Sequence, residues 1–193
     1  MKEGDNFLAA VIYSAGEGEA VDRTLSCLAR ELEGRGYKIA GTVQRSIPRS
    51  SRCTCDMMVR DLSADREVQI SEDRGPNARG CRLDSRVLEG LVGSTLSALD
   101  RGVDAVIINK FGKQEARGAG FRGVIAQTIL RPTPVITSVN SAYFDSWRLF
   151  ADGLADELKP DRNILVDWIT RRLRTDVVRR DSFAERPSLG EVL

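Results

Sequence analysis

Short apolar runs alternate along this chain with longer segments in which apolar residues recur every three or four positions. The clearest run, at 7–13, is uninterrupted, and further strands are expected at 37–43, 103–108 and 134–138. Runs of this length are typical of strands buried on both faces of a parallel sheet. The periodic segments between them predict helices that cover those faces. The sequence therefore predicts an α/β fold of three layers, with a mostly parallel sheet between helices.

The other elements are expected from the same periodicity and from Gly-, Pro- and Ser-rich breaks. Helices are expected around 21–32, 88–99, 121–129, 144–154 and 165–173, a hairpin from 57–62 and 67–70, and loops at 45–55 and 71–82. Asp84 or Ser85 is expected to cap the second helix. We expect one α/β domain over 1–158. The C-terminal helix and polar tail over 159–193 are expected to pack on it or to trail it.

The composition excludes several classes of site and partner. The chain has no histidine, which rules out Ser-His-Asp and Cys-His triads and His-ligated metals. Its 193 residues carry 29 Lys and Arg against 28 Asp and Glu, a net charge of +1 that provides no global field for nucleic acid or anionic lipid. No apolar run approaches the roughly 20 residues of a membrane span. Four cysteines without an export signal predict the cytoplasm.

Ligands of open parallel sheets bind at the carboxyl ends of the strands, so three loops are of most interest. These are 14–19, 109–120 and 139–143. Glycines in the first loop, followed by a helix, are typical of a phosphate-binding turn, in which backbone N–H groups and the helix N-terminus face an anion. Gly16, Glu17, Gly18 and Glu19 are therefore candidate ligand-binding residues. The alternative is a tight turn whose acidic residues favour the helix dipole.

The second loop carries groups of both charges directly after an apolar strand. Asn109, Lys110, Gly112 and Lys113 are candidate anion-binding residues, and Glu115 is the candidate catalytic residue because a carboxylate can orient a water molecule. The alternative is a solvated loop that caps the following helix. We expect the first and second loops to converge on a single anion-binding cleft.

A third group combines thiols with arginines on polar loops. Guanidinium groups favour the thiolate form of a nearby cysteine and also bind oxyanions through forked hydrogen bonds. These loops can serve a metal, oxyanion or redox role, or they can carry ordinary thiols; no metal site is assigned. The fourth cysteine, Cys27, is expected in the core. The candidate residues are Cys53, Cys55, Asp56, Cys81, Arg82 and Asp84.

The segments NKFGKQE at 109–115, GCRLD at 80–84 and CTCDM at 53–57 resemble a bacterial family known as a domain of unknown function. Members of that family are often encoded beside molybdenum-transport or molybdoenzyme genes. The resemblance spans roughly residues 7–158. The family is similar in turn to P-loop nucleoside triphosphatases of the archaeal and vertebrate nucleotide-phosphatase type. Those enzymes have a Gly-rich loop after the first strand and an Asp-Glu-x-Gly-x-x-Glu segment after a central strand.

The resemblance implies a P-loop-like fold with altered charges at two places. Gly16 and Gly18 match the phosphate loop, whereas Glu19 and Ala20 replace its Lys and its Ser or Thr. In the second segment Gly112 and Glu115 match. Asn109 stands where that segment has Asp, and Lys110 stands where it has Glu. Both positions associated with Mg²⁺, Ala20 and Asn109, have therefore lost their usual ligand.

These changes predict an accessory protein that binds a nucleoside triphosphate or another anion with weak or no hydrolysis. A first alternative is a nonenzymatic protein that binds molybdate, tungstate or a metal through the Arg and Cys loops. A second is an interaction module whose pocket has decayed. The expected partners are a small anion or nucleotide and a second copy of the chain or a molybdenum-pathway protein, without nucleic acid or membrane.

Overall fold

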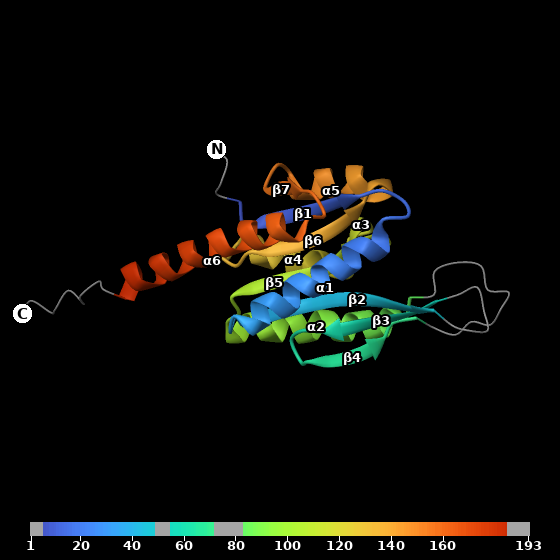
Figure 1. The fold of residues 1–193 in the computed structure, drawn as a ribbon, viewed down its shortest axis with the longest axis horizontal. Coiled ribbons are helices and arrows are strands. Elements are labelled where there is room, and N and C mark those ends of the chain that lie inside the picture. The colour runs from blue at the N-terminus through green and yellow to red at the C-terminus, as the bar shows by residue number, and fades with distance from the viewer. Residues whose placement is uncertain (1–5, 49–54, 72–82, 185–193) are drawn as a thin grey trace, which may run out of the picture.

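A computed structural model describes residues 6–48, 55–71 and 83–184 (Figure 1). The strands are β1 (Leu8–Tyr13), β2 (Ile39–Pro48), β3 (Cys55–Asp61), β4 (Arg66–Gln69), β5 (Ala105–Phe111), β6 (Val135–Asn140) and β7 (Ala155–Leu158). The helices are α1 (Gly18–Gly34), α2 (Ser85–Arg101), α3 (Lys113–Ala116), α4 (Arg122–Ile129), α5 (Phe144–Ala151) and α6 (Arg162–Ala184), with a 3₁₀ turn, η1, at Ser141–Tyr143.

The described strands form one seven-stranded sheet in the order β4-β3-β2-β5-β6-β1-β7. The five strands from β2 to β7 in this order are parallel, whereas β3 and β4 extend the sheet as an antiparallel hairpin. The expected mostly parallel sheet and the expected hairpin are both confirmed.

Helices cover both faces of the sheet, as expected. Alternate residues of β1 separate the two cores: Leu8 and Ala10 face one core, and Ala9 and Val11 face the other. The first core includes apolar residues of α2, α4 and α5, and the second includes those of α1 and α6. In Figure 1, α1 and α6 cross in front of the sheet, and α2 and α4 lie behind it.

Three strand predictions need correction. β2 continues to Pro48 because β3 pairs with it as far as the Pro48–Cys55 pair. Residues 45–48, expected in a loop, are therefore strand residues. β5 continues through Asn109 and Lys110 to Phe111, with a register shift against β6. The edge strand β7 was not expected, since its sequence ADEL has only two apolar residues and an edge strand needs only one buried side.

Two helix predictions also need correction. Cys27 is exposed on α1 rather than in the core, because Leu25 and Leu28 occupy the inward positions beside it. The last helix, α6, begins at Arg162 and extends to Ala184, well beyond the expected segment. Residues 185–193 lie outside the described part of the chain.

The first half of α6 packs against the domain. Leu165 and Ile169 are fully buried in the same core as α1. The guanidinium of Arg172 lies 3.7 Å from the centre of the Trp168 ring and donates to Asp156 of β7 at 2.6 Å. These contacts fix the beginning of the helix on the sheet edge, while the division at 158 stays a prediction.

Candidate functional site

The ends of β1, β5 and β6 lie at one edge of the sheet, as the parallel pairing requires. β1 and β6 are neighbours whose last pair is Tyr13–Asn140. The chain leaves β1 toward α1 on one face and leaves β6 toward α5 on the other. A crevice is expected where neighbouring parallel strands send their connections to opposite faces. The glycine turn at 14–19 follows β1 directly, so it lies beside this expected crevice.

A carboxylate closes the glycine turn by a hydrogen bond to the backbone of its first residue. The Glu17 N–H donates to the Ser14 carbonyl at 3.2 Å, and the Ser14 N–H donates to Glu17 Oε2 at 2.6 Å. Gly16 adopts a φ of +90°, which only glycine adopts readily. Glu19 extends to solvent, where it pairs with Arg23. The turn at 14–19 thus carries two acidic side chains and no ammonium group.

Between this turn and β5 lies a buried charged cluster. Asp22, on the second turn of α1, is buried. Its Oδ1 accepts from Asn109 Nδ2 at 3.1 Å, and its Oδ2 lies 3.4 Å from Lys110 Nζ. Asn109 Oδ1 in turn accepts from the backbone N–H of Gln44 at 2.9 Å. The two β5 side chains therefore tie α1 to β5, and Asn109 also holds the end of β2.

Burial and charge act in opposite directions on this cluster. Burial raises the pKa of Asp22, and the Lys110 ammonium and the Asn109 amide partly offset that rise. Burial also raises the pKa of the Tyr13 hydroxyl, and the nearby Asp22 carboxylate adds to the effect. Sequence reasoning missed Asp22. The signal available was an acidic residue next to Val21 in the apolar stripe of α1.

The carboxylate of Glu115 is engaged by backbone groups. It is buried, and its two oxygens accept from Gly112 N–H at 2.9 Å and from Phe121 N–H at 3.0 Å. A Cβ atom at Gly120 would lie 2.2 Å from Glu115 Oε1, so this position accommodates only glycine while the carboxylate stays in place. The arrangement is that of a capping side chain that closes the 112–121 segment. A catalytic role for Glu115 stays a prediction.

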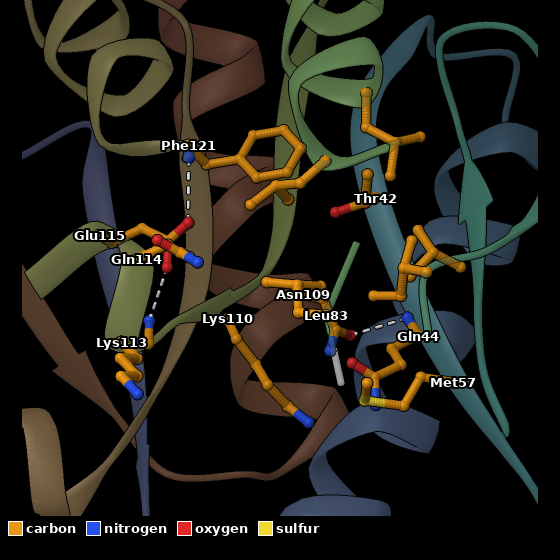
Figure 2. Close-up of a pocket in the computed structure, with 15 residues that line it drawn as sticks. Thr42, Gln44, Met57, Leu83, Asn109, Lys110, Lys113, Gln114, Glu115 and Phe121 are labelled. Carbon is orange, nitrogen blue, oxygen red and sulfur yellow. Dashed lines mark hydrogen bonds between the residues drawn. The ribbon is translucent and has the colours of Figure 1, made fainter. Parts of the chain in front are cut away.

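The 109–115 segment lines a cavity of about 240 Å³ on the α2 side of the sheet (Figure 2). Aliphatic residues of β3 and α2 form much of its wall, with Phe121 beyond α3. Lys110 and Lys113 also line it, and their ammonium groups extend to the same side in Figure 2. Lys113 is exposed, and its ammonium has no hydrogen-bond or ion-pair partner among the described residues.

The expected single cleft is therefore present only in part. The glycine turn and β5 do meet, through the Lys110–Asp22 contact. However, the described lining of the cavity includes no residue of 14–19. The cavity is formed instead by β2, β3, β5, α2 and the segment around α3. The reason is that Asp22 and Asn109 fill the space between the turn and the cavity with side chains.

The third group of predicted residues lies only partly within the described chain. Cys53, Cys81 and Arg82 lie outside it, and Cys55 and Asp56 are described only as backbone residues of β3. Asp84 is the N-cap of α2, where its side chain accepts from the N–H groups of Arg86 and Val87. Within residues 6–48, 55–71 and 83–184, no group of three or more His, Cys, Asp or Glu side chains is arranged to hold a metal ion. No helix within those ranges is long and apolar enough to cross a membrane.

Residues 8–168 match the family model described as "Protein of unknown function (DUF2478)". The chain belongs to this DUF2478 family. Over 163 residues, 84% of its length, it is 35% identical to "Molybdenum import ATP-binding protein ModC 2" of Bradyrhizobium diazoefficiens. The match spans only 18% of that relative. No solved structure matches the chain.

With the observed sheet, this similarity gives the DUF2478 chain a P-loop NTPase-like α/β fold. That the β1–turn–α1 unit and the end of β5 correspond to the two characteristic segments of such folds stays a prediction. Glu17, Glu19 and Asp22 place negative charge on α1 and the turn before it. Positive charge comes from Lys110, near the end of β5, and from Lys113 just after it.

Proposed function

We propose that this chain binds a nucleotide or a related organic anion on its P-loop-like scaffold, without efficient hydrolysis, as a cytoplasmic accessory of molybdenum handling. The observation that carries the proposal is the cavity at the end of β5, with Lys113 exposed, unpaired among the described residues and beside an apolar wall. Apolar pockets with a few polar or charged groups are typical of small-molecule sites. The molybdenum link rests on the name of the Bradyrhizobium relative.

The residues argue against Mg²⁺-dependent hydrolysis. A P-loop enzyme holds Mg²⁺ through a Ser or Thr hydroxyl and an Asp carboxylate, and its Lys neutralises the phosphates. Here Ala20 and Asn109 stand at the first two positions and Glu19 at the third. Of the other carboxylates near the turn, Asp22 is already paired with Lys110, and Glu17 already accepts from the Ser14 N–H. This set of side chains supports the proposal of binding without efficient hydrolysis.

The anionic part of the ligand is expected to lie beside Lys113 rather than inside the glycine turn. Glu17 already satisfies Ser14 N–H, so an anion there would have to displace a carboxylate. Lys110, whose side chain is 34% exposed, contributes a second positive charge. Its ion pair with Asp22 offsets part of that charge. Lys113 is therefore expected to be the main electrostatic contact.

Replacing Lys113 with alanine is expected to weaken ATP binding about tenfold, because it removes a charged contact worth about 1.4 kcal/mol. Titration calorimetry of ATP measures this change, and a phosphate-release assay tests hydrolysis in parallel. Lys38→Ala is the matched control, since Lys38 is also exposed but precedes β2 at the opposite edge of the sheet. Equal ATP affinity in the wild type and in Lys113→Ala would contradict the proposed site.

A second candidate function, direct binding of molybdate or tungstate, is favoured by the name of the relative. It assigns the oxyanion to the Arg and Cys loops rather than to Lys113. Thermal unfolding separates the candidates, because a ligand at 100 times its Kd stabilises the fold by about 2.7 kcal/mol. Stabilisation by molybdate alone, reduced by Cys81→Ser or Arg82→Ala, supports the second candidate. No shift with ATP, molybdate or tungstate supports an interaction module.

A further inference from the structure

Besides the charged Lys113, three uncharged polar side chains of the cavity have no hydrogen-bond partner among the described residues. These are the Thr42 hydroxyl and the carboxamides of Gln44 and Gln114. Thr42 is only 4% exposed, and the two glutamines are half-buried. Figure 2 shows the Thr42 hydroxyl and the Gln114 amide directed toward the open middle of the cavity. These groups face the open cavity, and a few unpaired polar groups in an otherwise apolar pocket are typical of a small-molecule site.

The walls around these groups are apolar. Met57 and Val59 of β3 and Leu88 and Leu91 of α2 contribute aliphatic side chains, and Phe121 contributes a ring. Such walls suit the faces of a flat ring system, whereas the three polar groups suit its edge. The volume of about 240 Å³ is below the range of about 300–1,000 Å³ for whole drug-sized ligands. It therefore suits part of a nucleotide rather than all of it.

The chemistry of the polar groups selects among ring edges. A carboxamide pairs in bidentate fashion with an edge that has a donor beside an acceptor, as adenine has. Guanine also has a donor beside an acceptor, at N1–H and O6, but its two adjacent donors, N1–H and N2–H, are matched best by a carboxylate. The carboxylate in the described lining, Glu115, already accepts from two backbone N–H groups. The polar groups of the cavity therefore favour an adenine-type edge, in which an amino N–H donor lies beside a ring-nitrogen acceptor.

We propose that this cavity is the subsite for an adenine-type base, held by Gln114, Gln44 and Thr42 between the sheet and α2. This rests on the proposed function, because Lys113 on the same cavity then receives the phosphate. It separates the base from the glycine turn, which lines no described part of the cavity. The nucleotide thus lies along the end of β5 on the α2 side, with the Asp22 cluster between it and the turn.

Titration calorimetry with AMP and GMP tests the base, since both carry the same phosphate. We expect AMP to bind about tenfold more tightly, the effect of two additional hydrogen bonds. Thr42→Val and Gln114→Met keep the side-chain size but remove the polar groups, and each is expected to reduce the preference for AMP. Gln127→Met on the exposed side of α4 is the control and is expected to leave it unchanged. The subsite proposal is overturned if AMP and GMP bind with equal affinity, or if neither variant changes the preference for AMP.

Photolabelling with 8-azido-AMP tests the location. Adducts are expected on β3 and α2, at residues such as Met57 or Leu88; adducts confined to 14–20 overturn the placement. The outcomes also separate this inference from the proposed function. If AMP and GMP bind equally and both depend on Lys113, the base subsite fails while anion binding stands. If neither nucleotide binds, both proposals fail.

Discussion

Replacing Lys110 with methionine is expected to lower the free energy of unfolding by about 2–3 kcal/mol at pH 7. The substitution keeps most of the aliphatic stem but removes the ammonium 3.4 Å from Asp22 Oδ2. The carboxylate then stays buried with the Asn109 amide as its remaining described partner. Removing one member of a buried ion pair is costly, at about 3–5 kcal/mol, and the 34% exposure of Lys110 reduces that figure here. Urea denaturation measures the change.

The loss is expected to depend on pH in a direction fixed by Asp22. Because burial raises the pKa of this carboxyl group, the folded state holds the proton more tightly than the unfolded state. Ionised Asp22 therefore costs stability at neutral pH, and the cost disappears as the pH falls toward its unfolded pKa of about 3.9. Removing Lys110 raises the folded pKa further. The difference between the wild type and the variant should be largest near pH 7 and should nearly vanish near pH 4.

The double variant Asp22→Asn with Lys110→Met is the control for this prediction. It removes both charges, so it is expected to recover most of the stability lost in Lys110→Met at pH 7. A loss of the same size at pH 4 and pH 7, or no recovery in the double variant, would show that Lys110 contributes through its packing rather than its charge.

Replacing Glu115 with alanine is expected to lower the free energy of unfolding by about 3 kcal/mol. The change releases the N–H groups of Gly112 and Phe121 and leaves a void at a buried position. The loss should be concentrated in 112–121, where amide hydrogen exchange should become faster than in β5. Glu115→Gln keeps one carbonyl oxygen as an acceptor and is expected to lose about half as much.

Glu89 provides the matched control for Glu115. It is exposed on α2, so Glu89→Ala is expected to change stability by less than about 0.5 kcal/mol. If Glu115 instead serves as a general base, Glu115→Gln would abolish any phosphate release while leaving urea denaturation unchanged. That result would contradict the capping role.

The sequence allowed the fold to be predicted because the decisive signals are local. The apolar run of β1, the cap at Asp84 and the spacing of the helix stripes each lie within a few residues. The end of β5 could not be predicted in the same way. Asn109 and Lys110 look like loop residues, yet Asp22, which fixes them within the strand, is 87 and 88 residues away in sequence.

The candidate site was predictable to a similar extent. The carboxyl edge of the sheet and the lysines at and just after the end of β5 follow from topology and local sequence. The cavity does not, because its walls come from β2, β3 and α2, and residues such as Val59 and Leu91 have the same apolar character as the core they adjoin. The closure of the glycine turn by Glu17 depended on a side-chain conformation that local sequence does not fix.

Calorimetric titration of ATP in EDTA and in Mg²⁺, with the wild type and Lys113→Glu, tests the central claim most directly. The account predicts that ATP binds in EDTA, because Ala20 has no ligand atom for the metal and Asn109 Oδ1 already accepts from the Gln44 N–H. It also predicts that charge reversal at Lys113 abolishes binding in both buffers. Binding that requires Mg²⁺ and survives Lys113→Glu would contradict the account, since it would place the phosphates at the glycine turn.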